Sequence, residues 1–180
     1  MLIDTRDFGD IEVNDEELIT FPAGLFAFED LRKFALISPL GEDVYPKWLQ
    51  SVEDLTPCFV VFDPEIIEEN YVVKLESFEE KLLKLDGGLT DKNSNDLKFL
   101  AIATVPDDFK KTVVNMKAPI VINMANRLAT QVILPSDCNY DFRFRLYENS
   151  DESSDSKDGY SPIAGEQGNA PNEKMGGVSC

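Results

Sequence analysis

The sequence predicts an all-β fold: a small β-barrel-like or sandwich domain with one or two short helices, followed by a disordered acidic C-terminal tail. Three observations predict it. Short apolar segments recur at a spacing of roughly 8–12 residues with turn residues between them, which is typical of barrels and sandwiches. Helical patterns are scarce, and the composition changes near residue 147. The expected strands are 17–21, 34–40, 47–52, 57–63, 70–75, 97–105, 111–116, 119–124, 130–134 and 139–148.

The expected strands differ in how many of their faces are buried. Residues 139–148 alternate aromatic or aliphatic side chains with charged ones, which indicates one buried face. The segments 57–62 (PCFVVF) and 118–123 (APIVIN) are nearly continuous apolar runs. Such runs are typical of strands that are buried on both faces.

Helix is expected mainly at residues 77–85. Ser77 is placed to be the N-cap, and Glu80 three residues later would complete a capping box before a leucine-rich turn. Residues 28–34 could form one more helical turn. The segment 86–96 is rich in Gly and Asn and is expected to be an exposed loop.

The composition excludes several classes of function. The 180 residues contain 34 Asp and Glu against 17 Lys and Arg, a net charge of −17, and no histidine. Histidine-ligated zinc and Ser-His-Asp catalysis are therefore excluded, and direct nucleic-acid binding is disfavoured because phosphates need a basic surface. Paired carboxylates arise by chance among so many acids, so we expect no catalytic residues, no metal and no cofactor. An acidic chain favours basic partners.

The cysteines and the N-terminal residues indicate a cytoplasmic protein without membrane attachment. The N-terminal residues are acidic and lack the apolar core of a signal peptide, and no stretch approaches the roughly 20 apolar residues of a membrane span. Cys58 is expected in the core and Cys138 in a polar turn, while Cys180 is the last residue. This spacing predicts neither a disulfide framework nor a metal site.

The chain divides into a folded domain, residues 1–148, and a low-complexity tail, residues 149–180. The tail is rich in Ser, Gly, Asp, Asn and Pro and has few apolar residues. Such a composition buries too little surface to offset the entropy of ordering, so we expect the tail to be disordered.

Three segments resemble one known family. They are FPAGLFAFEDLRKF (21–34), PKWLQSVEDLTPCFVVFDP (46–64) and VVNMKAPIVINMANRLATQVIL (113–134). Together they resemble the bacterial flagellar assembly factor FliW over residues 1–148. The chain departs from the family pattern where Phe26 and Ala27 replace a proline and a glycine, and where Ala129 replaces another glycine.

The resemblance implies a non-enzymatic regulator with a small β-barrel-like domain. Proteins of this family bind the translational repressor CsrA and relieve its repression of flagellin mRNA. They also bind flagellin, so that flagellin in the cytoplasm captures the factor and releases the repressor. The alternative from composition alone is a barrel that binds a small ligand, and a carboxylate-dependent hydrolase ranks third.

The expected partner surface centres on residues 63–71, where acids surround apolar side chains. Trp48 is added because tryptophan is enriched at interface hot spots, although packing on the barrel is an alternative for it. Asn115 and Asn123 flank an expected strand pair, and a turn hydrogen bond is an equally good explanation of Asn115. The residues expected to bind a partner are Trp48, Asp63, Glu65, Ile66, Glu68, Glu69, Tyr71, Asn115 and Asn123.

Overall fold

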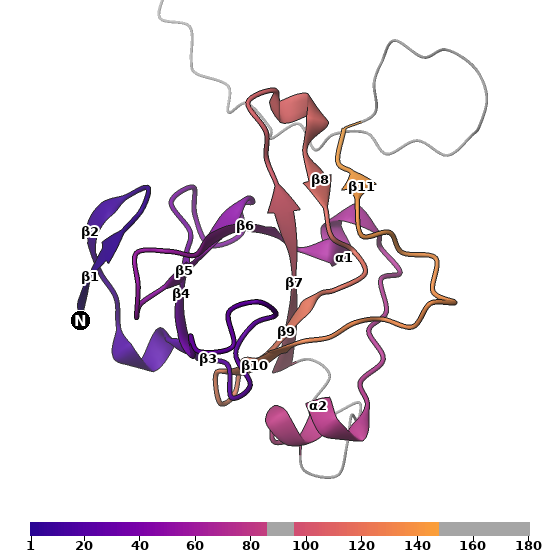
Figure 1. The fold of residues 1–180 in the computed structure, drawn as a ribbon, viewed down its shortest axis with the longest axis horizontal. Helices are drawn as coiled ribbons and strands as arrows, with labels where there is room; N and C mark the ends of the chain where they lie inside the picture. The colour runs from indigo at the N-terminus through magenta and orange to yellow at the C-terminus, as the bar shows by residue number, and fades with distance from the viewer. Residues whose placement is uncertain (86–95, 148–180) are drawn as a thin grey trace, which may run out of the picture.

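The computed structural model describes residues 1–85 and 96–147, and within them a strand ring forms the body of the molecule (Figure 1). The ring order is β7-β6-β5-β4-β3-β10-β9, and pairing of β9 with β7 closes it. The expected all-β, barrel-like sheet is thus confirmed. The strands of the ring are β3 (Ile19–Thr20), β4 (Lys33–Ile37), β5 (Lys47–Ser51), β6 (Cys58–Phe62), β7 (Leu97–Thr104), β9 (Ile120–Asn123) and β10 (Leu128–Gln131).

Closure depends on β7, which is long enough to pair with several strands. Its first half runs antiparallel to β9, with Leu97 opposite Asn123, and its second half runs antiparallel to β6, with Ala103 opposite Val60. The ring contains one parallel contact, between β10 and β3. Residues 97–100 of β7 pair with β9, residues 101–103 with β6 and residues 103–104 with β8, so every residue of β7 has a ladder partner.

Further elements extend from the ring or cover it. Past the ring, β8 continues the sheet from the end of β7, and β11 pairs with β8 (Figure 1). A separate hairpin joins β1 to β2. The bounds of these elements are β1 (Leu2–Thr5), β2 (Gly9–Glu12), β8 (Val113–Val114), β11 (Phe144–Arg145), α1 (Pro64–Ile67), α2 (Ser77–Leu82) and the 3-10 helices η1 (Asp15–Glu17) and η3 (Phe109–Lys111).

Apolar side chains form an inner cluster, which fills the ring, and an outer cluster outside it. The side chains of one strand can belong to both clusters: on β7, Leu100 and Ile102 belong to the inner cluster, and Phe99 belongs to the outer cluster. All four residues of β9 are buried, so 118–123 is buried on both faces as expected. The segment 57–62 is less completely covered, because three of its residues are only half-buried. Cys58 is buried in the core, as expected.

Residues 70–75 were expected to form a strand, and this expectation is wrong. The segment lies outside the sheet without a ladder partner. The burial of its side chains nevertheless alternates, because Tyr71, Val73 and Leu75 face the outer cluster while Val72 and Lys74 are exposed. The physical reason for the missing strand is that the backbone finds other partners: the N–H of Tyr71 donates to the backbone oxygen of Glu68, and the N–H of Val72 donates to the hydroxyl of Tyr140.

Other boundaries also differ from the expected ones. Within 139–148, the described residues 139–147 contain only the two-residue strand β11, and 28–34 contains turns and the start of β4 instead of a helix. Helix α2 confirms the expected helix, but its N-cap is Glu76, whose N–H donates to Glu79 at 2.8 Å, so the cap lies one residue before the expected Ser77. Strands β1 and β2 were not expected. The expected loop 86–96 lies, apart from Asp96, outside the described residues, as does the tail 149–180.

Candidate functional site

Residues 63–71 begin with a short helix instead of the expected loop. Asp63 directly follows β6 and caps α1, since its Oδ1 accepts a hydrogen bond from the N–H of Glu65 at 3.0 Å. Pro64 suits the first helical turn because the missing N–H would have no helical partner there. The hydroxyl of Tyr45 donates to the other carboxylate oxygen of Asp63 at 3.4 Å. Asp63 is therefore half-buried and mainly holds the helix in place.

Apart from Ile67, which packs against the outer apolar cluster, the remaining side chains of α1 and the following turn face solvent. Glu65, Glu68 and Glu69 are exposed, and Ile66 is 41% exposed. Partial desolvation, together with the Asp63 carboxylate, raises the pKa of Glu65. This part of the predicted surface therefore exists as expected: acids surround an exposed apolar side chain.

Two tyrosines hold the next residues against a distant part of the chain. Tyr71 is buried, and its hydroxyl donates to the backbone oxygen of Met116 at 2.6 Å. The ring of Tyr140 lies 4.5 Å from that of Tyr71, centroid to centroid. The hydroxyl of Tyr140 accepts a hydrogen bond from the N–H of Val72 at 2.9 Å. Tyr71 thus supports the surface from inside and offers no side-chain surface to a partner.

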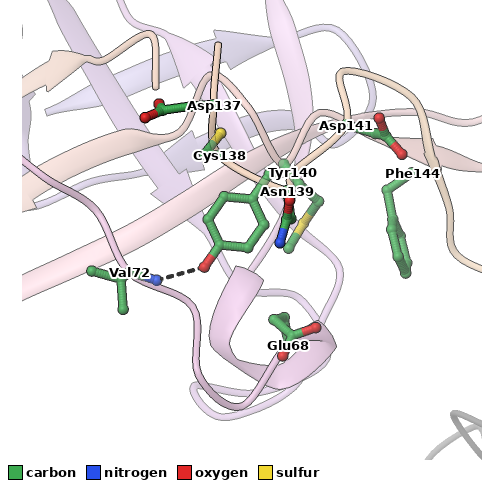
Figure 2. Close-up of a pocket in the computed structure, with 9 residues that line it drawn as sticks. Glu68, Val72, Asp137, Cys138, Asn139, Tyr140, Asp141 and Phe144 are labelled. Carbon is green, nitrogen blue, oxygen red and sulfur yellow. Dashed lines mark hydrogen bonds between the residues drawn. The ribbon is translucent and has the colours of Figure 1, made fainter. Parts of the chain in front are cut away.

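A groove of about 490 Å³ lies between this segment and residues 137–144 (Figure 2). Its charged side chains are all acidic: Glu68 from the end of α1, and Asp137 and Asp141 from the facing segment. Val72 and Phe144 add exposed apolar surface, with 66% and 37% of each residue exposed. The groove is lined by Glu68, Val72, Met116, Asp137, Cys138, Asn139, Tyr140, Asp141 and Phe144.

Three other residues expected at a partner surface have structural roles. Trp48 is half-buried on β5, where its ring makes an edge contact with Phe8 at 5.3 Å between centroids. Asn115 accepts hydrogen bonds from the N–H groups of residues 117 and 118, which is the turn explanation. Asn123 is buried, and its amide donates to the backbone oxygen of Leu83 at 3.0 Å.

The structure therefore joins part of the predicted surface with residues that sequence reasoning missed. Of the predicted residues, Glu68 reaches the groove, and Glu65, Ile66 and Glu69 lie beside it on α1 or just after it. The missed wall is residues 137–144, of which 139–144 were expected to belong to a strand and Cys138 to a polar turn. Pro135 and the polar run that follows it were the available signal for a loop.

The inside of the ring is packed, and the described residues form no metal-binding cluster. They contain no cluster of three or more acidic or cysteine side chains able to hold a metal ion. The interior is packed with fully buried side chains such as Phe21, Phe34 and Leu49. None of the described helices has the length and apolar character needed to cross a bilayer.

Comparison with known proteins identifies the family. The family model described as FliW protein matches residues 2–146. The chain belongs to the FliW family. Among similar proteins, the flagellar assembly factor FliW of Thermoanaerobacter pseudethanolicus is 37% identical over 137 residues, which is 76% of this chain and 87% of that protein. The corresponding protein of Caldicellulosiruptor bescii is 40% identical over 153 residues, 84% of this chain and 95% of that protein.

A solved FliW structure supports the same conclusion. A crystal structure of the flagellar assembly factor FliW superimposes with a TM-score of 0.72 at 31% identity, covering 83% of this chain and 99% of that one. Ala27, at a position where the resemblance led us to expect a glycine, adopts a positive φ of 67°.

Proposed function

We propose that this chain is a non-enzymatic flagellar assembly factor of the cytoplasm that binds a CsrA-like translational repressor and relieves its repression of flagellin mRNA. In the same proposal it also binds flagellin, so that the two partners exchange on it. The observation that carries the proposal is membership of the FliW family over nearly the whole described chain. The family name implies protein partners in flagellar assembly.

The charge of the chain supports a basic partner for the groove. A protein that binds RNA presents a basic surface to the phosphates, and the groove carries Glu68, Asp137 and Asp141 without any basic lining residue. None of these three carboxylates forms a salt bridge with a described basic group. They are therefore available to a basic partner.

The apolar side chains supply the second component of such an interface. Interface affinity comes largely from a few buried apolar or aromatic anchors, while charge mainly sets specificity and association rate. Val72 and Phe144 on the groove, with Ile66 on α1, are exposed and suit that role. We propose that Glu65, Ile66, Glu68 and Glu69 form one side of the repressor-binding surface and residues 137–144 the other.

Isothermal titration of the full chain with its cognate CsrA-like repressor tests the proposal, and a second titration after saturation with flagellin tests the exchange. We expect saturable binding that flagellin weakens or abolishes. The variant Glu68→Lys/Asp141→Lys should weaken repressor binding by about tenfold or more, because it places positive charge in the groove.

The matched control is Glu12→Lys/Glu16→Lys, which changes net charge equally on exposed residues of the N-terminal hairpin and the turn after it. It should bind the repressor nearly as the unmodified chain does. If both variants weaken repressor binding equally, the overall charge of the chain, and not the groove, determines the binding. No binding of either partner by the unmodified chain would overturn the proposed function.

A further inference from the structure

The 3-10 helix η3, the strand β11 and the residues that flank β11 carry a basic and aromatic surface, none of whose residues lines the acidic groove. It consists of Phe109, Lys110, Lys111, Arg143, Arg145 and Tyr147, and we name it the basic–aromatic surface. All four cationic side chains belong to exposed residues, and Phe109 is 58% exposed. A concentration of cations is unexpected on a chain with a net charge of −17.

Backbone pairing brings these residues together from two separate segments. Arg145 lies opposite Val113, two residues after Lys111, and the N–H of Leu146 donates to the backbone oxygen of Thr112 at 3.0 Å. The rings of Phe109 and Tyr147 make an edge contact at 5.8 Å between centroids. The surface is thus a consequence of the β8–β11 register.

Most of the cations have no acidic partner among the described residues. Lys111 lies 3.5 Å from Asp108, and both groups are largely exposed, so this pair is weak. Lys110, Arg143 and Arg145 form no salt bridge with a described carboxylate. A nearby anionic segment would therefore gain Coulomb energy from several cations at once.

We infer that the acidic segment 148–158 of this same chain docks on the basic–aromatic surface. The chain leaves that surface at Tyr147, and the 33 residues that follow contain seven acids and two bases. Asp151, Glu152, Asp155 and Asp158 lie within eleven residues of Tyr147, a reach of up to about 35–40 Å for an extended chain. The occupant is covalently attached and opposite in charge.

Attachment makes even weak pairing effective. A short tether gives an effective concentration on the order of millimolar, far above that of a separate partner in a cell. Any external polyanion would have to displace the segment first, so the contact would shield the exposed cations of the basic–aromatic surface.

Amide resonances of the 15N-labelled full chain test this contact. The variant Asp151→Asn/Glu152→Gln/Asp155→Asn/Asp158→Asn removes the tail charges that we assign to it. We expect its resonances to differ from those of the unmodified chain at Phe109–Lys111 and in β11, and not in β1, β2 or β4. The difference should shrink in about 0.5 M salt, where the Debye length is about 4 Å.

A peptide of residues 148–180, added to the neutralised variant, should shift the same resonances. Adding Lys110→Glu/Lys111→Glu to that variant should abolish the shift, whereas Lys74→Glu/Lys81→Glu, an equal charge change at exposed sites elsewhere, should preserve it. Unchanged resonances at Phe109–Lys111 on neutralising the tail would overturn the inference. Equal loss of the peptide-induced shift with Lys110→Glu/Lys111→Glu and with Lys74→Glu/Lys81→Glu would also overturn it. None of these readouts involves the repressor or flagellin, so they stand apart from the proposed function.

Discussion

Gly24 is a position where a single added carbon would conflict with the backbone. Its φ is +75°, and an added Cβ would lie 2.6 Å from the Cα of Glu29. Gly9 has a similar φ of +65°, but an added Cβ there would meet nothing within 4 Å. The two glycines therefore separate the cost of a left-handed backbone from the cost of a steric clash.

We expect Gly24→Ala to lower the free energy of unfolding by about 3 kcal/mol or more, and Gly9→Ala by only about 1 kcal/mol. Both substitutions place an alanine in the left-handed conformation that L-residues avoid, but only Gly24→Ala also forces the turn before Glu29 to move. Urea unfolding of both variants measures the difference. Equal destabilisation would show that the turn accommodates a side chain.

Ala27 presents the opposite case in the same turn. Its φ is +67°, and the resemblance led us to expect a glycine there. Ala27→Gly should raise the free energy of unfolding by about 0.5–1 kcal/mol, since the relieved strain of about 1–2 kcal/mol exceeds the added freedom of the unfolded chain. Ala125→Gly is the control at an exposed alanine without a positive φ, and it should be neutral or destabilising. A loss of stability in Ala27→Gly as large as in the control would contradict the strain argument.

At the scale of elements, α1 depends on its cap. Asp63→Ala removes the acceptor for the N–H of Glu65 and should lower the free energy of unfolding by about 1 kcal/mol, within the range of about 0.5–2 for such caps. Asp63→Asn removes the same charge but keeps a capping oxygen, so it should lower the free energy of unfolding by only a few tenths of a kcal/mol. Chemical denaturation of the two variants checks this. If Asn destabilises as much as Ala, the charge of Asp63 matters more than its cap.

Sequence reasoning predicted elements well where burial alone determines the pattern. The runs at 57–62 and 118–123 were identified because a strand between two apolar clusters needs apolar side chains on both faces. It failed at 70–75, whose alternation is that of a strand, because alternation reports which side chains are buried and says nothing of whether a backbone partner is available.

The candidate site was only half predictable for a related reason. Residues 63–71 stand out because acids and apolar side chains are adjacent in sequence. Residues 137–144 join them only through tertiary contacts, above all the hydrogen bond between Tyr140 and Val72. Trp48 and Asn123 were favoured by residue type, yet their surroundings in the fold give them packing and hydrogen-bonding roles.

At the scale of the whole molecule, two kinds of surface lie next to each other outside the strand ring. The groove beside α1 carries acids and apolar side chains, whereas η3, β11 and the residues that flank β11 carry the basic–aromatic surface. The segment 137–147 contributes to both, since Asp141 lines the groove and Arg145 lies four residues further on. A binding event at the groove therefore contacts the same stretch of chain that forms β11.

The net charge of −17 also makes a kinetic prediction about the whole chain. If a basic repressor is its partner, long-range attraction should raise the association rate constant at low salt, and this constant should fall by about 10-fold or more between about 20 mM and 500 mM salt. The dissociation rate constant should change much less, because apolar anchors at the groove hold the complex once formed. Surface plasmon resonance with immobilised repressor measures both constants, and Glu68→Lys/Asp141→Lys, which reverses two exposed charges, should mainly lower the association rate constant. An association rate constant independent of salt would show that the charge of the chain does not steer this encounter. A dissociation rate constant that rises steeply with salt would mean that ion pairs, and not Val72 and Phe144, supply most of the affinity.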